Sequence, residues 1–165
     1  HTEMLRQLEA DIAAVTIDGK DVPVKLRVYE SLFVPMAKWS MLLTGNYRCV
    51  EADGVRPIRD AVHGDIVAST EMYGWVDALA RQLGADPADQ VPFEKYANAA
   101  NGLLKPSSAA RAIDSGTDRI ERVDRLVQMI GRGLGLQNQQ LDEIVAIVDA
   151  RLAANANFKK MANVG

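Results

Sequence analysis

The sequence predicts an all-α protein: a single helical domain of six to eight helices, with two long helices at its centre. Apolar residues recur at helical spacing along most of the chain, and glycines or prolines stand where one periodic segment gives way to the next. A strand-like pattern is confined to one short segment near the N-terminus. Together these observations favour helices packed on helices over any sheet architecture.

The clearest helix is predicted from Pro57 to Leu83. Its apolar stripe advances in helical steps and consists of Ile58, Val62, Ile66, Tyr73, Val76, Leu79 and Leu83. Pro57 suits the first helical turn, because a proline there gives up no hydrogen bond. Gly84 and the following Asp86-Pro87 pair are typical of a helix end.

The second long helix is predicted from Val24 to Leu43, with Pro35 expected to kink or split it. Near the N-terminus, Val15-Thr16-Ile17 followed by Asp18-Gly19 predicts a short strand and a turn. Periodicity and flanking residues predict five shorter helices, over residues 4–14, 93–104, 107–114, 117–133 (capped by Thr117) and 141–152.

These elements divide the chain into three parts. Residues 24–155 form the helical domain, and residues 1–23 are expected to be a linker or the remnant of a preceding domain. Residues 156–165 are expected to be a frayed tail.

Composition excludes several classes of protein. The net charge of -3 is spread along the chain, so the basic footprint of a nucleic-acid-binding protein is missing. Apolar runs stop far short of the ~20 residues that span a bilayer, and no signal-peptide pattern opens the chain. We therefore expect a cytoplasmic protein that engages neither membrane nor nucleic acid.

Few residues are suited to metal binding or nucleophilic catalysis. The chain has one cysteine, Cys49, and two histidines, which cannot complete a structural zinc site. A site built from carboxylates alone stays open, although no EF-hand spacing supports it. Cys49 is interpreted as a buried thiol with no local activating partner.

The usual cofactor motifs are also missing. No G-x-G-x-x-G follows a strand, and neither a P-loop nor a G-x-S-x-G occurs. The nearest pattern, Gly131-Arg132-Gly133-Leu134-Gly135, closes a predicted helix rather than opening one, so we interpret it as a stop signal.

One run of residues resembles a known family. Ser107 to Gly116, then Thr117-Asp118-Arg119-Ile120-Glu121, then Gly131 to Gly135 is similar to the C-terminal domain of ketopantoate (2-dehydropantoate) reductases, which is 6-phosphogluconate-dehydrogenase C-terminal-like. Upstream, Lys38 and Asn46 match the family's lysine and the asparagine eight residues beyond it. The resemblance covers roughly residues 36–150.

The resemblance implies an NAD(P)-dependent oxidoreductase. Lys38 would be the catalytic acid toward the keto oxygen, and Asn46 and Ser107 would position the substrate. The domain would bind substrate and form a homodimer. NADPH or NADH would be held by a separate N-terminal Rossmann domain, without which the chain would be inactive.

Two departures from the family pattern bear on the substrate. Leu42 stands where the family has an amide, and Arg119 stands where it has a glutamate. Exchanging a carboxylate for a cation favours a more anionic ligand, so Arg119 joins the predicted substrate-binding residues. The expected substrate is therefore a 2-keto acid or a related carbonyl compound, and not necessarily ketopantoate itself.

Each site residue also has a purely structural interpretation. Lys38 can snorkel from a half-buried face, Asn46 can end a helix, Ser107 can cap the next helix, and Arg119 can lie on a solvated face. On that interpretation, the alternative function is a non-catalytic helical module for homo-oligomerisation or protein interaction.

Overall fold

The computed structural model describes residues 1–29 and 31–162, and it confirms the all-α fold class. The described residues contain eight α-helices and one small two-stranded sheet. The chain divides into two compact units between Leu32 and Phe33, whereas the sequence predicted a division near residue 23. None of the described helices is both long and apolar enough to cross a membrane.

The first unit contains helix α1 (Thr2–Ala14) and the antiparallel strands β1 (Thr16–Ile17) and β2 (Lys20–Asp21). The turn between the strands places Asp18 and Gly19 at φ 52° and 72°. Aspartate and glycine tolerate these angles, which two-residue hairpin turns require. The strand and turn predicted from the sequence are thus confirmed. No residue of α1 is buried.

The second unit begins with a continuous run of helical turns. The run comprises the 3₁₀ turn η1 (Val34–Met36), helix α2 (Ala37–Met41), the π-helical turn η2 (Leu42–Asn46) and the 3₁₀ turn η3 (Tyr47–Cys49). The prediction of a helix from Val24 was wrong, since residues 24–29 and 31–33 are not helical. Pro35 lies in the first turn of this run, where its missing N–H costs nothing, rather than in the middle of a helix.

The predicted helix from Pro57 to Leu83 is two helices, α3 (Ile58–His63) and α4 (Ile66–Gln82). The break falls at Gly64 and Asp65, where the Asp65 carboxylate accepts a hydrogen bond from the Ala68 N–H and starts α4 anew. The predicted end is confirmed, because Gly84 follows α4 at φ 109°. The α4 residues Met72, Val76 and Leu79 are fully buried in the main core.

After the short 3₁₀ turn η4 (Pro87–Asp89) come α5 (Phe93–Ala100), α6 (Ser108–Asp114), α7 (Val123–Gly133) and α8 (Gln139–Ala162). Thr117 does not cap α7, contrary to prediction. Its N–H bonds to the Ala112 carbonyl, and with Gly116 at φ 91° it closes the end of α6. Residues 117–122 are non-helical, and among them Ile120 packs against the main core.

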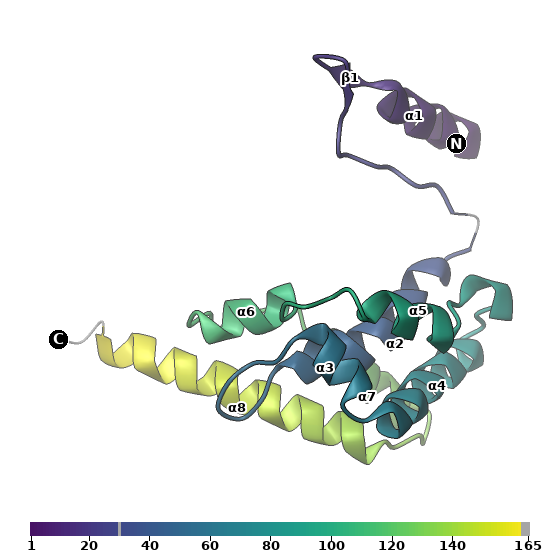
Figure 1. Ribbon diagram of the computed structural model, residues 1–165. Helices are drawn as coiled ribbons and strands as arrows, with labels where there is room; N and C mark the ends of the chain where they lie inside the picture. The colour runs from purple at the N-terminus through teal and green to yellow at the C-terminus, as the bar shows by residue number, and fades with distance from the viewer. Residues whose placement is uncertain (30, 163–165) are drawn as a thin grey trace. The chain divides into compact units, whose positions relative to one another are not determined.

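Helix α8 lies beside α6 and is 24 residues long (Figure 1). It continues through Ala162 instead of ending near Leu152, so residues 156–162 are not frayed. The rest of the predicted tail lies outside the described residues. Asn155 helps to hold the extension, because its amide donates to the carbonyls of Ile113 and Thr117 at 2.8 and 2.9 Å.

Candidate functional site

A groove beside α6 brings together two of the predicted substrate-binding residues. It has a volume of about 530 Å³ and is formed by the loop between α5 and α6, the first residue of α3 and the end of η2. Its lining residues are Asn46, Ile58, Gly102, Leu103, Leu104, Lys105, Pro106, Ser107, Ser108 and Arg111. Asn46 and Ser107, 61 residues apart in the sequence, thus share one surface.

Ser107 is held by two hydrogen bonds. Its hydroxyl accepts from the Ala110 N–H at 3.1 Å, which confirms it as the N-cap of α6. The same hydroxyl donates to the Asn46 carbonyl at 2.8 Å, and the residue is only 3% exposed. Because the hydroxyl is already engaged on both sides, Ser107 fixes the position of Asn46 more than it offers a free group to a ligand.

The π-helical turn η2 brings Asn46 to the groove. A π turn inserts an extra residue into a helix and is common at functional positions. The turn is packed against Tyr96, whose hydroxyl donates to the Met41 carbonyl at 3.1 Å. Gly45 leaves room for that hydroxyl, since a Cβ at this position would lie 2.0 Å from the Tyr96 oxygen. Tyr96 of α5 thus packs against the π turn, and Ser107 of the groove binds the Asn46 carbonyl at its end.

The groove is positively charged. Lys105 and Arg111 line it, and no acidic residue is found among the described residues of the lining. Neither cation forms an ion pair or side-chain hydrogen bond with another described residue. Ile58, Leu103, Leu104 and Pro106 supply apolar surface beside these two charges. The arrangement suits a small molecule with an anionic end and an aliphatic end.

The other two predicted residues lie elsewhere. Lys38 is exposed on α2 and is not among the residues that line the groove. Arg119 is exposed in the segment that joins α6 to α7, and it too lies outside the lining. The structure therefore brings together Asn46 and Ser107 but adds neither Lys38 nor Arg119 to them.

Sequence reasoning missed Lys105 and Arg111. Arg111 follows Ser107 by four residues, which is one helical turn, so the two residues lie on one face of the helix. The signal was the position of a lysine and an arginine on either side of a capping serine. The loop packs over Ile58 because the Ile58 and Arg59 N–H groups donate to the carbonyls of Lys105 and Leu103. No sequence pattern indicates these two hydrogen bonds.

The described residues give little support to three other kinds of site: a reactive thiol, a metal site and a dinucleotide site. Cys49 is fully buried, and burial raises the pKa of its thiol, while hydrogen bonds from Ser107 oppose the shift only in part. Within residues 1–29 and 31–162 no group of three potential metal ligands gathers. The strands there are two residues long and antiparallel, so they do not form the strand, glycine turn and helix that hold a nicotinamide dinucleotide.

Comparisons of the chain with protein-family models, with curated proteins and with solved structures each returned no significant match.

Proposed function

We propose that the groove beside α6 binds a small 2-keto acid, and that this chain is the substrate-binding part of an NAD(P)H-dependent reductase. The observation that carries the proposal is the convergence of Asn46, Lys105 and Arg111 on one groove whose described lining residues include no acidic side chain. A guanidinium group can bind a carboxylate through two parallel hydrogen bonds, and the ammonium group adds a second charge.

The groove also suits the size and polarity of such a ligand. Its volume lies within the ~300–1,000 Å³ of typical small-molecule sites. The apolar residues of the loop and of α3 can cover an aliphatic chain, while the Asn46 side chain offers both a donor and an acceptor to a keto or hydroxyl oxygen. A carboxylate at one end and a short hydrocarbon at the other match this division of the surface.

Binding can be tested by titrating the chain with 2-oxobutanoate and following amide chemical shifts. We expect shifts in residues 102–111, and we expect Arg111→Gln to weaken binding by roughly tenfold, since it removes a charged hydrogen-bond donor. Arg119→Gln is the matched control, because it removes the same charge outside the groove. Loss of binding in Arg119→Gln but not in Arg111→Gln would show that the ligand lies elsewhere. Butanamide, which lacks the carboxylate, should not bind.

The reductase part of the proposal concerns Lys38 and the cofactor. Because the described residues offer no dinucleotide site, the cofactor would be held by a separate Rossmann domain, and hydride transfer would need both parts. NADPH oxidation by the 165-residue chain with 2-oxobutanoate would contradict this division of labour. Because Lys38 lies outside the groove, Lys38→Ala should leave ligand affinity unchanged, and its effect on turnover in the reductase tests the catalytic role that the family resemblance gives Lys38.

A homo-oligomerisation module is the second candidate. Helix α7 exposes Leu126 and Met129, three residues apart on one face, with Leu134 just beyond the helix, and Met129 is 69% exposed. Exposed apolar side chains on one helix face are typical of a contact surface. Light scattering after size exclusion should then report a dimer that Met129→Glu converts to a monomer. A monomeric wild-type chain would remove this candidate.

A further inference from the structure

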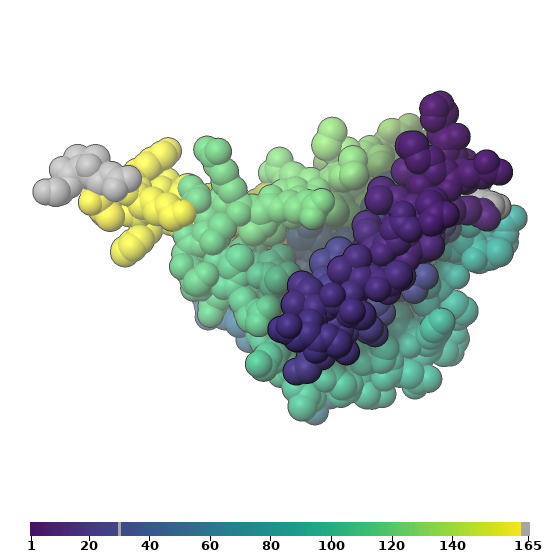
Figure 2. All heavy atoms as spheres, turned by 90° about the horizontal axis from the view of Figure 1, so that it is seen from above, coloured from purple at the N-terminus to yellow at the C-terminus, as the bar shows by residue number. Residues whose placement is uncertain are grey.

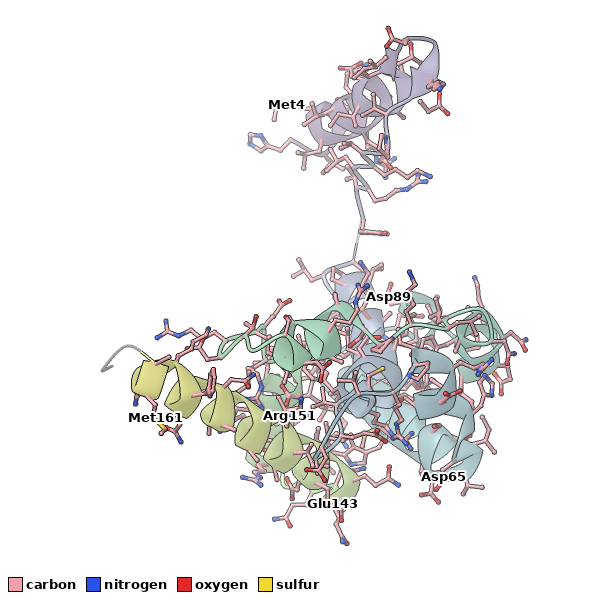
Figure 3. All side chains as sticks on the ribbon, turned by 60° about the vertical axis from the view of Figure 1, so that its left-hand side comes forward. Met4, Asp65, Asp89, Glu143, Arg151 and Met161 are labelled. Atoms are coloured by element: carbon pink, nitrogen blue, oxygen red, sulfur yellow. The ribbon has the colours of Figure 1, made fainter. Side chains whose placement is uncertain are left out.

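A second cavity, which shares no lining residue with the groove beside α6, lies between the 50–55 hairpin, the start of α4 and helix α8. Its volume is about 340 Å³. Arg48, Arg56, Asp65 and Glu143 give it four charged side chains, and Ile144 and Ile147 of α8 form an apolar wall. Figure 3 labels Asp65 at the start of α4 and Glu143 on α8, which lie toward the same end of the unit.

Arg48 is held in this cavity by a neutral partner. Its Nη1 donates to the Ser69 hydroxyl at 2.5 Å, and that hydroxyl donates in turn to the Val62 carbonyl at 2.7 Å. No carboxylate of a described residue lies within ion-pair distance of the Arg48 guanidinium, although Asp65 attracts it through space. The remaining N–H groups of Arg48 are thus free to bind another acceptor.

Arg56 places a second guanidinium beside the first. Its Nε donates to the Arg48 carbonyl at 2.8 Å and faces the half-exposed Glu51 carboxylate at 3.7 Å. The described residues offer its two terminal nitrogens no hydrogen-bond partner. Burial, and then the charge of Arg56, lower the pKa of Arg48. An anion between the two groups would counter the repulsion between them and favour the charged form of Arg48.

Each of the two carboxylates of the cavity accepts a hydrogen bond through one of its oxygens. Asp65 accepts from the Ala68 N–H at 2.9 Å as the N-cap of α4, and Glu143 accepts from the Gln139 amide at 2.9 Å. The cavity therefore has unused donors on two arginines, while Asp65 and Glu143 keep their negative charges in its lining.

We propose that this cavity binds the phosphate group of a small phosphorylated molecule. A phosphate monoester carries about -1.5 to -2 charges at neutral pH and three acceptor oxygens, which matches two guanidinium groups better than a carboxylate does. The apolar wall on α8 would contact the carbon skeleton beside the phosphate. The site is separate from the groove proposed to bind the keto acid, and it can exist whether or not that groove binds one.

The test is a calorimetric titration of the chain with inorganic phosphate and with glycerol phosphate, with acetate at equal ionic strength as the carboxylate comparison. We expect saturable binding of both phosphates and weaker binding of acetate. Arg48→Gln and Arg56→Gln should each weaken phosphate binding by roughly tenfold, because each removes charged donors. Arg119→Gln is the matched control, since it removes an exposed arginine that lines neither the cavity nor the groove, and Arg111→Gln reports any phosphate that binds in the groove instead.

A gain of affinity provides a readout that misfolding cannot mimic. Glu143→Gln removes a negative charge from the cavity and keeps the side chain's size, so it should tighten phosphate binding by roughly threefold. If Arg48→Gln fails to fold, as circular dichroism would show, Arg56→Gln and Glu143→Gln decide the matter. The proposal is overturned if phosphate does not bind saturably, or if only Arg111→Gln affects binding.

Discussion

Gly45 is the residue on which the candidate groove depends most closely. It lies in the π-helical turn just before Asn46, and an added Cβ would lie 2.0 Å from the Tyr96 hydroxyl and 3.2 Å from an Ile58 methyl. We therefore expect Gly45→Ala to destabilise the protein by about 1–3 kcal/mol, the usual range for overpacking a filled core. Urea unfolding measures the change, and amide shifts at Asn46 report whether the turn has moved.

Two further variants separate packing from the general effect of replacing glycine. Gly74 lies within α4 with nothing within 4 Å of its added Cβ, so Gly74→Ala should stabilise the protein by about 0.5–1 kcal/mol. Adding Tyr96→Phe to Gly45→Ala removes the nearest clashing atom and should recover part of the loss. A Gly45→Ala protein as stable as the wild type would mean that the turn is not confined by Tyr96.

At the scale of the elements, the sequence predicted which helices occur more accurately than where each helix begins and ends. Helices around 4–14, 93–104, 107–114 and 141–152 all occur, because their periodic residues and flanking punctuation agree. The end of α4 at Gly84 and the start of α6 at Ser107 were local enough to be found from single residues. Those signals act within one turn of the chain.

The errors have tertiary causes. The break between α3 and α4 depends on an Asp65 cap inside an unbroken apolar stripe, so periodicity alone joined the two helices. The late start of α7 depends on Ile120 packing against the core and on Tyr47, whose hydroxyl accepts from the Val123 N–H at 2.9 Å and donates to the Glu121 carbonyl at 2.6 Å. Such contacts join residues more than seventy positions apart, which no local pattern reports.

The candidate groove shows the same limit. Ser107 and Asn46 were selected by resemblance, and the structure places both in one groove. Lys105 and Arg111 could be found only from the structure, because the groove forms where the loop packs over Ile58. An unpaired cation looks like any surface cation in a sequence. Its lack of a carboxylate partner becomes visible only when its neighbours in space are known.

The extension of α8 beyond Leu152 leads to a prediction for that element. Asn155 donates to the Ile113 and Thr117 carbonyls, one on α6 and one just beyond it, so Asn155→Ala should cost about 1–2 kcal/mol of unfolding free energy by leaving these acceptors without a donor. Asn157, two residues on and exposed, is the matched control; Asn157→Ala should change stability by only a few tenths of a kcal/mol. Equal effects of the two substitutions would argue against this role of Asn155.

The final turns of α8 leave large apolar side chains in solvent. Phe158 and Met161 are 75% and 76% exposed, and in Figure 2 the last described turns, in yellow, project past the green atoms of the α6 region.

In the first unit, α1 likewise exposes Met4 and Leu8. A 13-residue helix without buried residues is only marginally stable on its own. The buried hydrophobic core belongs to the second unit.

Within the second unit, one charged network links α7 to α8. Arg122 donates to both carboxylate oxygens of the fully buried Asp124 at 2.8 and 2.7 Å and to Asp149 of α8 at 2.5 Å. Arg125 donates to the other Asp149 oxygen at 2.5 Å. Burial opposes ionisation of Asp149, but the hydrogen bonds from Arg125 and Arg122 outweigh it and hold the pKa of Asp149 below its usual value.

This network predicts how the stability of the whole unit depends on pH. Because the pKa of Asp149 is lower in the folded state than the value of about 3.9 expected when unfolded, its contribution is fully present above pH 4 and is lost as the pH falls through the folded value. Asp149→Asn should therefore lower the free energy of unfolding by about 1–2 kcal/mol at pH 7. The difference in the free energy of unfolding from the wild type should shrink steadily below pH 4.

Urea unfolding at pH 7, 5 and 3 measures both effects. Asp53→Asn, an exposed change outside the network, should stay within about 0.5 kcal/mol of the wild type at each pH, and a constant deficit for Asp149→Asn down to pH 3 would show that the charge of Asp149 is not what stabilises the unit.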